Sequence, residues 1–598
     1  MTKSEINNER LEGEELTGAE IVIQALKDCG VDTVFGYPGG SILPVYDVLF
    51  STKGLDHKLV RHEQGAAHAA EGYARSTGKP GVMIVTSGPG ITNTITGLTD
   101  AYMDSIPVIC ISGQVPTFMI GTDAFQEADA TGLTRSCTKH NYLVKDIEKL
   151  AETIFNAFHI ATTGRPGPVL IDVPKDIQLK KTKYYGWKKS VKASYRPVYR
   201  GDKEKIEQAV KMISEAYRPV FYVGGGVINS GDEASALLKE LVERTDFPIT
   251  STLMGLGAFS GEDESFLGML GMHGTYEANM AMHDSDLIIA VGSRFDDRAT
   301  GKPDGFSPNS KKIHIDINPA SINKNIKVDL GIVGDVASVL EDMLVILREK
   351  GHKKDIAKLK PWWDQIGKWR AKNCLAYNQD MSKNAIIKPQ YAIEQLYKAV
   401  KDKDFYITTE VGQHQMWTAQ YFKFKEPKRF MTSGGLGTMG YGLPAAIGVQ
   451  VAHPKSLVID VSGDSSVMMN LQEMATAIQY KLPIKIFLIN NGWMGMVRQW
   501  QELIHGGRYS QSTTSEAMPD FVKLVEAFGG TGFRADTVGD LDNVISKMIT
   551  TDGLVLADIR VEQEANCFPM VPAGKAHDQV VLASDAETLD REDLIKLF

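Results

Sequence analysis

Short apolar runs rich in Val, Ile and Leu alternate with longer helical patterns along the chain, and this alternation restricts the possible fold more than any other feature. Runs so continuously apolar suit strands that are buried on both faces. Helices between them connect parallel strands through right-handed crossovers. The pattern therefore predicts an α/β protein built on doubly wound parallel sheets. The runs are GVMIVTSGPG (81–90), PVICISG (107–113), VLIDVP (169–174), PVFYVGGG (219–226), LIIAVGS (287–293), KIHIDINP (312–319), SLVIDVSGD (456–464) and IKIFLINNG (484–492).

The strand-like runs fall into three blocks, as expected for a chain of 598 residues. The charged segment between the second and third blocks predicts a helical connection. The start of the chain is rich in Glu and predicts a disordered tail. The end, with NCFPMVPAGKAHDQ, has too much Pro and Gly for regular structure; such a segment can cover a site or lie on the surface. The expected boundaries are a tail at 1–15, domains at 16–185, 202–350 and 387–564, a linker at 351–386 and a tail at 565–598.

Charge and cysteine content exclude several classes of protein. The net charge of −9 argues against a nucleic-acid surface. The five cysteines form no C-x-x-C pair, which favours a reducing, cytoplasmic setting, and Cys110 is expected to be a buried core thiol. No apolar stretch reaches the roughly 18 residues of a membrane span. The acidic N-terminus does not resemble a signal or transit peptide.

Polar residues follow two successive strands of the third block. Gly463-Asp464-Ser465 ends one run and Asn490-Asn491 ends the next. Ligands of open parallel sheets bind outside the carboxyl ends of the strands, and the oxygens of Asp and Asn suit Mg²⁺. A helix after Ser465 would direct its N-terminal amides at an anion. A lone Asp-Ser turn is usually only a helix cap, but the pair matches the thiamine diphosphate signature, with Ser465 where that pattern has Gly.

Glu63 begins an Ala-rich helix that follows a predicted strand. A Glu in a first helical turn commonly serves only as a cap or dipole partner. Thiamine diphosphate needs one such acid, because a carboxylate at pyrimidine N1′ favours the imino tautomer that removes the C2 proton. Glu63 has the position that this role requires.

The chain resembles the acetohydroxyacid synthases, also called acetolactate synthases, from the first block to the tail. The resemblance implies three α/β domains, namely a pyrimidine-binding domain, a central FAD-binding domain and a domain that binds diphosphate and Mg²⁺. The segments that carry it are FGYPGGSILPVYD (35–47), RHEQGAAHAAEGYAR (61–75), TSGPGITN (86–93), GTDAFQE (121–127), GSRFDDRATG (292–301), EVGQHQMW (410–417), TSGGLGTMGYGLPAA (432–446) and GMVRQWQ (495–501).

The resemblance assigns the cofactor contacts. Met439 would hold thiamine diphosphate in its bent form, and Mg²⁺ would be bound by Asp464, Asn491 and the carbonyl of Trp493. The expected thiamine diphosphate contacts are Val411, Gly412, Gln413, His414, Gly437, Met439, Gly463, Asp464, Ser465, Ser466, Asn491, Met494, Gly495 and Met496. The expected FAD contacts are Arg165, Gly224, Gly225, Gly226, Asn229, Thr252, Leu253, Leu270, Gly271, Met272, His273, Gly292, Arg294, Asp296, Arg298, Asp316, Ile317, Gly334 and Asp335.

The glycine run at 224–226 lacks the full G-x-G-x-x-G spacing, and tight turns explain most such runs. An Asp after a strand, such as Asp316, can bind a ribose or can cap a helix. Both interpretations of these central residues therefore stay open.

The resemblance also implies a substrate pocket. Trp500 would line the space for the second ketoacid and favour the extra methylene of 2-ketobutyrate, worth about 1–3 kcal/mol. Arg298 would hold the carboxylate of that substrate. Gln126 and Lys175 would face the same pocket. Together with Glu63 and Met439, these are the expected catalytic residues. Core packing or an ion pair is the ordinary explanation for a single Trp or Arg.

The implied reaction decarboxylates pyruvate on thiamine diphosphate and transfers the hydroxyethyl unit to pyruvate or 2-ketobutyrate. This is the first common step towards valine, leucine and isoleucine, and FAD would take no net redox part. A pyruvate oxidase is the closest alternative; Trp500 and RFDDR favour the synthase. Glyoxylate carboligase lacks the acid found here as Glu63, and catabolic acetolactate synthase lacks FAD. A non-catalytic scaffold conflicts with intact Glu63, Asp464 and Asn491.

The family resemblance further implies a homodimer at minimum, with each site shared between subunits, and a separate regulatory subunit in some members. The sequence does not specify dimer or tetramer, the docking surface of a regulatory subunit, feedback sensitivity or the numerical preference between the ketoacids.

Overall fold

The computed structural model describes residues 13–186, 195–351 and 354–588. The described residues form two compact units. The first takes in the described residues of 1–196 together with 435–454 and 470–482, and the second takes in those of 197–434, 455–469 and 483–598.

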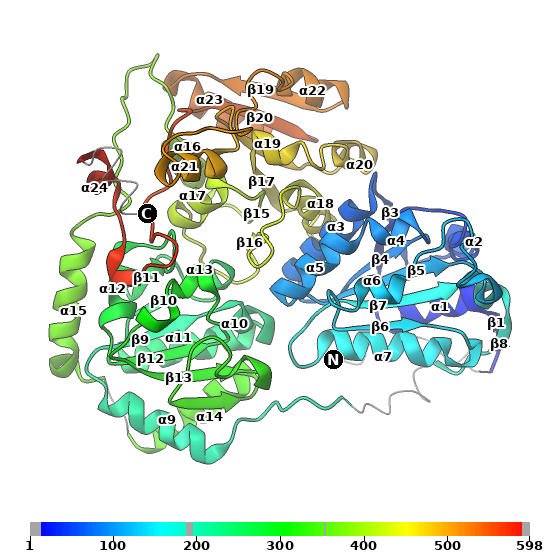
Figure 1. Cartoon of the computed structure of the whole chain (residues 1–598), viewed down its shortest axis with the longest axis horizontal. Helices are drawn as coiled ribbons and strands as arrows, with labels where there is room; N and C mark the ends of the chain where they lie inside the picture. Colours follow the sequence, from blue (N-terminus) through cyan, green and yellow to red (C-terminus); the bar gives the residue numbers. More distant parts are fainter. Residues whose placement is uncertain (1–12, 187–194, 352–353, 589–598) are drawn as a thin grey trace. The chain divides into compact units, whose positions relative to one another are not determined.

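The first unit contains a six-stranded sheet in which every paired strand is parallel (Figure 1). Its order is β3 (Asp56–Leu59), β2 (Thr33–Gly36), β4 (Gly81–Val85), β5 (Val108–Gln114), β7 (Val169–Pro174) and β6 (His140–Leu143). Its helices are α1 (Gly18–Asp28), α2 (Leu43–Ser51), α3 (Glu63–Thr77), α4 (Pro89–Thr92), α5 (Ile95–Asp104), α6 (Ala130–Thr134), α7 (Leu150–Thr162) and α8 (Lys175–Leu179), with α18 (Gly442–Ala452) and α20 (Glu473–Gln479) from later in the chain.

A short antiparallel pair lies near the start of the chain. β1 (Glu15–Thr17) pairs with β8 (Lys181–Lys183). Of the tail expected at 1–15, residues 1–12 lie outside the described residues, whereas Glu15 already belongs to β1.

The second unit contains two further parallel sheets of six strands each. The central sheet has the order β11 (Phe266–Met269), β10 (Ile249–Ser251), β9 (Pro219–Val223), β12 (Leu287–Val291), β13 (Lys311–Asp316) and β14 (Leu330–Val333). The helices around it are α9 (Lys203–Glu215), α10 (Gly225–Ser230), α11 (Asp232–Thr245), α12 (Tyr276–Asp284), α13 (Asp297–Thr300), α14 (Val336–Glu349) and α15 (Ile356–Arg370).

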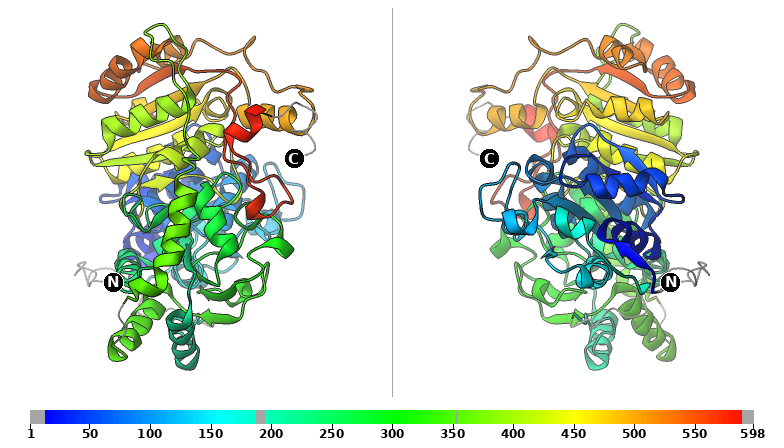
Figure 2. Two further views of the ribbon diagram at one scale, coloured as in Figure 1. Left: turned by 90° about the vertical axis from the view of Figure 1, so that its left-hand side faces the viewer. Right: turned by 90° about the vertical axis from the view of Figure 1, so that its right-hand side faces the viewer.

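The C-terminal sheet completes the second unit, and Figure 2 shows helices on both faces of its yellow-to-orange strands. Its order is β16 (Phe430–Met431), β15 (Phe405–Thr409), β17 (Leu457–Gly463), β18 (Lys485–Asn490), β20 (Val555–Arg560) and β19 (Thr531–Ala535). Its helices are α16 (Pro389–Val400), α17 (Gln413–Tyr421), α19 (Asp464–Val467), α21 (Gly495–Leu503), α22 (Phe521–Ala527) and α23 (Val538–Thr550), and α24 (Ala583–Thr588) lies near the C-terminus.

Burial on both faces explains the apolar runs. In β9, Phe221 and Val223 belong to one hydrophobic core, while Val220 and Tyr222 belong to another on the opposite side. Successive side chains of a strand point to opposite faces, so both faces of the sheet are covered. Every run predicted as a strand contains one, which confirms the α/β prediction and its three parallel sheets.

The segment expected as a charged linker carries a core face. Its predicted helix is present as α15, where Trp362 and Trp369 are almost fully buried against the central sheet and meet edge to face at 5.5 Å. The connection therefore packs as part of the central layer.

All five cysteines are free, and Cys110 is fully buried, as expected. Among the described helices, none is both long and apolar enough to cross a membrane.

Candidate functional site

Asp464 and Asn491 lie at the carboxyl edge of the C-terminal sheet. β17 and β18 are parallel neighbours, with Gly463 opposite Ile489, so both residues directly follow the paired strand ends. Both are buried, at 1% and 7% exposure. The sheet thus places the two predicted Mg²⁺ ligands on neighbouring strand ends. The helix expected after Ser465 is present as α19, a single turn that begins at Asp464.

The carboxylate of Asp464 has an unusual environment. Burial raises its pKa to about 7, and a hydrogen bond from Thr514 Oγ1 at 3.1 Å only partly opposes this effect. A nearby cation would favour the ionised form. Asn491 Oδ1 accepts a hydrogen bond from the Trp493 amide at 3.2 Å. These oxygen donors fit a hard divalent cation, although the part expected of the Trp493 carbonyl stays a prediction.

The first turn of α17 lies against two glycines. A Cβ atom at Gly463 would stand 2.7 Å from His414 Cε1, and one at Gly495 would collide with Gln413 Oε1 and lie 2.8 Å from Asn491 Nδ2. Their lack of side chains therefore lets α17 approach the ends of β17 and β18.

Several buried polar atoms at this edge have no partner among the described residues. They are His414 Nε2, Gln413 Oε1 and Ser465 Oγ. Burial also lowers the pKa of His414 to about 3, so its imidazole is neutral. Buried polar groups are rarely left unpaired in proteins, so these atoms are suited to a polar ligand. The edge fits a diphosphate held with Mg²⁺.

The remaining predicted thiamine diphosphate contacts divide between the two units. Ser466 bonds the Gly463 carbonyl at 3.2 Å, and the Met494 amide bonds the Ser512 carbonyl at 2.8 Å. Val411 and Gly412 directly precede α17, and Met496 is in the first turn of α21, all in the second unit. Gly437, which is exposed, and Met439, which is half-buried, belong to the first unit.

A cavity of about 360 Å³ opens beside Asn491. Arg534 and Arg560 line it, and each donates to the fully buried Asp558 at 3.1 Å. Asn490 donates to the other oxygen of that carboxylate at 2.8 Å. These bonds compensate the buried charge of Asp558 beneath the edge of the sheet.

Glu63 begins α3 in the first unit and is 9% exposed. Its Oε2 accepts a hydrogen bond from Asn93 Nδ2 at 2.9 Å. The turn of Gly88 and Gly90 lies close by: a Cβ at Gly90 would be 3.8 Å from Glu63 Oε1, and one at Gly88 would be 2.8 Å from the Gln126 carbonyl. The structure therefore places Glu63 and Gln126 around one turn. Lys175 begins α8 at the end of β7 in the same unit.

Two residues near Glu63 were not predicted from the sequence. Asn93 ends the TSGPGITN motif and orients the carboxylate. Glu473, on α20, is fully buried and accepts a hydrogen bond from the Arg61 amide at 2.9 Å. Asn93 could have been found from its motif, whereas Glu473 is more than 400 residues away in sequence and gave no local signal.

The first unit also holds a buried polar cluster outside the predicted sites. His68 Nδ1 lies 2.9 Å from Glu71 Oε1 and 3.9 Å from Asp100 Oδ2. Burial lowers the pKa of His68 to about 4 and raises that of Glu71 well above its ordinary value. The cluster joins α3 to α5 in the core.

The glycine run at the end of β9 packs against the end of β12. A Cβ at Gly226 would stand 2.7 Å from Gly292 Cα, and one at Gly224 would collide with the Gly292 carbonyl. Close backbone packing therefore accounts for these glycines, and it also exposes backbone at the carboxyl edge where an open sheet binds ligands.

Unpaired buried atoms mark this edge as well. Among the described residues, Tyr222 Oη, Ser251 Oγ, Ser293 Oγ and His273 Nε2 have no partner. His273 donates through Nδ1 to the Pro569 carbonyl at 3.2 Å, which leaves Nε2 as an acceptor. The edge of the central sheet can therefore accept a polar ligand such as a dinucleotide.

A helix cap, a turn and an ion pair account for part of the predicted FAD set. Asp335 accepts hydrogen bonds from the Ser338 amide at 3.3 Å and from Ser230 Oγ at 2.8 Å. Asp316 accepts one from the Asn318 amide at 2.7 Å. The side chains at 294 and 296 form an ion pair of 2.7 Å.

Arg165 is the only predicted FAD contact in the first unit, where it bonds Ser105 and Tyr102 near the end of α5. The other predicted contacts belong to the second unit, namely Gly225, Asn229, Thr252, Leu253, Leu270, Gly271, Met272, Ile317 and Gly334.

Arg298 and Trp500 meet within the second unit. The guanidinium carbon lies 5.8 Å from the indole ring, within reach of a cation–π contact. Arg298 also lies 3.2 Å from the Asp297 carboxylate, and its side chain remains largely exposed. The two residues predicted to bind the second ketoacid are therefore neighbours, from α13 and α21.

Comparison with known proteins gives consistent results over the whole chain. Family models of thiamine pyrophosphate enzymes match at residues 16–133 (N-terminal TPP binding domain), 206–343 (central domain) and 410–559 (C-terminal TPP binding domain). An acetolactate synthase large subunit of Haemophilus influenzae is 47% identical over 575 residues, which covers 96% of this chain and 99% of that protein. The isozyme 3 large subunit of Escherichia coli is 48% identical over 580 residues, covering 96% and 100%. An acetolactate synthase of Mycobacterium bovis is 46% identical over 575 residues, covering 95% and 92%.

Proposed function

Because the chain belongs to the thiamine pyrophosphate enzymes and, among them, to the acetolactate synthase large subunits, we propose that it forms 2-acetolactate from two molecules of pyruvate. This is the first common step towards the branched-chain amino acids. With 2-ketobutyrate as the second substrate, the product is 2-aceto-2-hydroxybutyrate.

The observation that carries this proposal is the position of α21. The helix begins at Gly495, which lies against Gln413 and Asn491 at the diphosphate edge. Trp500, on the same helix, lies beside Arg298. One helix thus connects the proposed cofactor edge with the proposed acceptor pocket, as an enzyme that joins two ketoacids requires.

Bound thiamine diphosphate would supply a nucleophilic carbon and accept the electrons released on decarboxylation. Asp464 and Asn491 would hold its Mg²⁺, and His414 Nε2 would bond the diphosphate. Glu63 would share a proton with the pyrimidine ring. Arg298 would bind the carboxylate of the second ketoacid, while the indole of Trp500 would form the apolar wall beside its alkyl group.

We further propose FAD at the carboxyl edge of the central sheet. The close packing of Gly224 and Gly226 on Gly292 and the unpaired buried atoms of Ser293 and His273 support a dinucleotide there. The five free cysteines support a reducing, cytoplasmic location.

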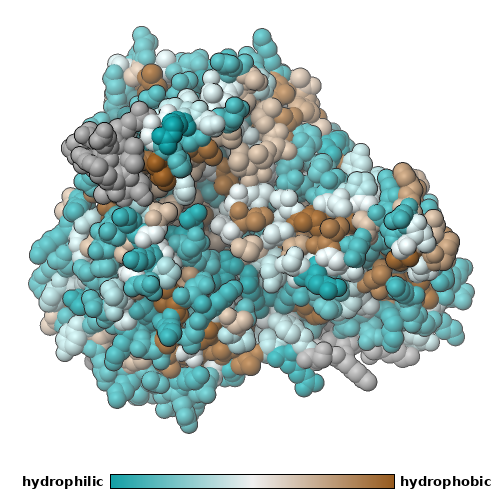
Figure 3. Space-filling view, in the orientation of Figure 1, coloured by the Kyte–Doolittle hydropathy of each residue, from teal (hydrophilic) through white to brown (hydrophobic). Residues whose placement is uncertain are grey.

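A homodimer, at minimum, would complete each site by bringing Glu63 of one copy to Asp464 of the other. Two large apolar side chains lie exposed beyond the carboxyl edge of the first sheet, where a second copy of the chain could cover them. Phe118 is 77% exposed and Phe125 is 87% exposed. Figure 3 shows hydrophobic areas that interrupt the hydrophilic surface. Such exposure is typical of an interface. The name "large subunit" of the relatives supports a regulatory small subunit as a further partner.

Flavin spectra distinguish the synthase from a pyruvate oxidase. The purified protein should contain one FAD per chain, and the flavin should stay oxidised while pyruvate is consumed under anaerobic conditions. Bleaching of the flavin at the rate of pyruvate consumption would instead assign an oxidase. A fully active protein without flavin would disprove the proposed role of the central sheet.

A further inference from the structure

The segment from Glu564 to His577 is irregular, yet residues 567 and 569–572 within it are buried. Cys567 and Met570 have no exposed surface, and Val571 is 2% exposed. In the left view of Figure 2 this segment begins beside the orange α21 and continues in red towards the green central sheet. We call residues 564–577 the strap. Irregular backbone is buried only where specific groups bond its amides and carbonyls.

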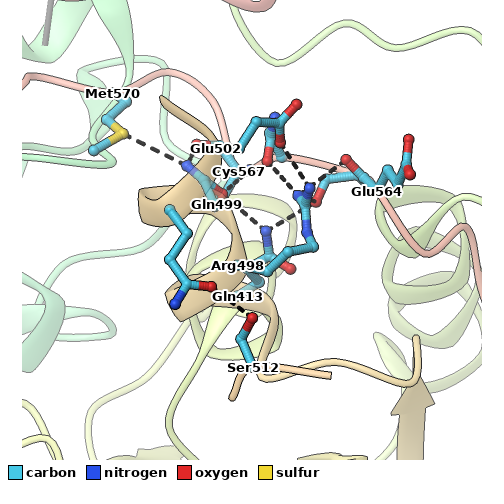
Figure 4. A network of polar contacts seen from close by, with 11 residues as sticks. Gln413, Arg498, Gln499, Glu502, Ser512, Glu564, Cys567 and Met570 are labelled. Carbon is cyan, nitrogen blue, oxygen red and sulfur yellow. Dashed lines mark hydrogen bonds and ion pairs between the residues drawn. The ribbon is translucent and has the colours of Figure 1, made fainter. Parts of the chain in front are cut away.

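Arg498 of α21 provides the largest set of these bonds (Figure 4). Its side chain is only 1% exposed and donates to Glu502 at 2.7 Å. It also donates to the carbonyls of Glu564 at 3.0 Å and Ala565 at 3.2 Å, and to Asn566 Oδ1. Asn566 donates to Glu502 in turn, at 3.1 Å. Glu502 compensates the buried charge, so the planar guanidinium can bond several strap oxygens at once.

Gln499, the next residue, fixes the register of the strap. Its Oε1 accepts hydrogen bonds from the Cys567 amide at 2.7 Å and from Gln413 Nε2 at 2.8 Å. Its Nε2 donates to the Cys567 carbonyl at 3.1 Å and to Met570 Sδ at 3.5 Å. Both ends of this fully buried amide are thereby used, and α21, α17 and the strap are joined at one point (Figure 4).

The other end of the strap bonds Met272, whose amide donates to the Arg298 carbonyl at 2.8 Å, and two residues that follow Arg298. The Val571 amide donates to the Met272 carbonyl at 2.7 Å, and the Lys302 amide donates to the Lys575 carbonyl at 2.9 Å. His577 Nε2 donates to the Ala299 carbonyl at 2.8 Å. The strap therefore contacts both α21, which carries Trp500, and α13, which carries Arg298.

We propose that Arg498 is a positioning residue: by anchoring the strap on α21, it sets the separation of Trp500 and Arg298 and thereby the choice of the second ketoacid. The inference deepens the proposed function and rests on it. Arg498 and Trp500 are two residues apart on one helix, so a shift of α21 on loss of the anchor would also move the indole. Loss of the anchor would leave both Trp500 and Arg298 in the pocket but would let the distance between their side chains vary.

The test uses two variants and a control. Arg498→Met keeps the length and apolar stem but removes every donor. Arg498→Lys keeps the charge beside Glu502 and loses the fork that bonds the strap carbonyls. Arg429→Lys is the matched control, because Arg429 is likewise held in ion pairs within the second unit, with Asp404 and Glu426, and these pairs include neither Trp500 nor Arg298. Each holoenzyme is given equal pyruvate and 2-ketobutyrate, and hydrogen exchange is followed in 564–577 and in β20.

In Arg498→Met, exchange of the Cys567 and Val571 amides should rise about tenfold or more while β20 is unchanged. The ratio of 2-aceto-2-hydroxybutyrate to 2-acetolactate should fall by about threefold or more. This is smaller than the full discrimination that a pocket can achieve for one methylene group. Both the amide exchange and the product ratio of Arg498→Lys should lie between those of Arg498→Met and wild type. Both values of the Arg429→Lys control should match wild type. Should Arg498→Met fail to fold, Arg498→Lys decides the question.

An unchanged product ratio with a loosened strap would overturn the proposal, and so would unchanged exchange in a folded variant. Absence of both products from the wild-type enzyme would instead contradict the proposed function, while the exchange data would still report on the anchor.

Discussion

The carboxylate of Glu63 is nearly buried at the start of α3 and accepts a hydrogen bond from Asn93. Glu63→Gln keeps the shape and that hydrogen bond but removes the charge proposed to act at the pyrimidine ring. We expect normal folding and cofactor binding, with exchange of the cofactor's C2 proton slowed by about 10²-fold or more. NMR of the quenched holoenzyme in D₂O measures this rate. Glu152→Gln, on the surface of α7, is the control, and wild-type exchange in Glu63→Gln would disprove the assigned role.

Asp172 makes stability depend on pH. Burial raises its pKa to about 7, and hydrogen bonds from Ser112 and Gln114 oppose the shift only in part. The folded protein keeps this proton between about pH 4 and pH 7, where the unfolded chain has lost it, so the free energy of unfolding falls as the pH rises through that range. The loss should be on the order of 4 kcal/mol.

Asp172→Asn should flatten this dependence, as measured by urea unfolding at a series of pH values. The control is Asp176→Asn: burial acts to raise the pKa of Asp176, but hydrogen bonds from Thr117 and Lys180 outweigh it, and the net pKa is lowered. Asp176 is therefore ionised in both states over the same range, and its variant should keep the slope of the wild type. An unaltered slope in Asp172→Asn would show that the carboxyl does not titrate there.

Single residues could be predicted where strand ends are visible in the sequence. Asp464 and Asn491 directly follow apolar runs, so parallel pairing alone brings them together. Glu473 and Arg498 could not be predicted, because their partners are hundreds of residues away or in an irregular tail. At Asp335 the sequence allowed two explanations, a ligand contact or a helix cap. The structure shows the helix cap.

At the level of elements, α3 and α18 pack in backbone contact. A Cβ at Gly448 would collide with the Ala69 carbonyl and stand 2.8 Å from the Tyr73 amide nitrogen. Gly448→Ala must push the helices apart and should cost about 1–3 kcal/mol. Gly367→Ala on α15 is the matched control: its Cβ meets nothing within 4 Å, so the change should stabilise the helix by about 0.5–1 kcal/mol. Thermal midpoints compare the two, and equal midpoints would refute this packing.

The strands were predictable because apolar runs have one main explanation, burial inside a parallel sheet. The packing partners of the helices were not. α18 and α20 lie in the third sequence block yet pack in the first unit, and α15 lies in the expected linker yet covers the central sheet. A buried helix face does not specify which surface it meets.

At the level of the whole molecule, the proposed site combines Glu63 from one compact unit with Asp464 from the other. If these come from different subunits, a Glu63→Gln chain and an Asp464→Ala chain should each be inactive alone. Co-expressed with separate affinity tags, they should give a heterodimer with one intact site and about half of the wild-type activity per dimer, provided the two sites act independently. Persistent inactivity in a verified heterodimer would show that each site is built within one chain.

The central claim is that this chain joins two ketoacids without oxidation. The most direct measurement supplies ¹³C-labelled pyruvate with thiamine diphosphate, Mg²⁺ and FAD, and follows products by NMR together with carbon dioxide and dissolved oxygen. We predict that two molecules of pyruvate are consumed for each carbon dioxide released, with 2-acetolactate as the product and no uptake of oxygen. Acetate or acetyl phosphate formed with equivalent oxygen uptake, or no turnover by the fully loaded dimer, would contradict the account.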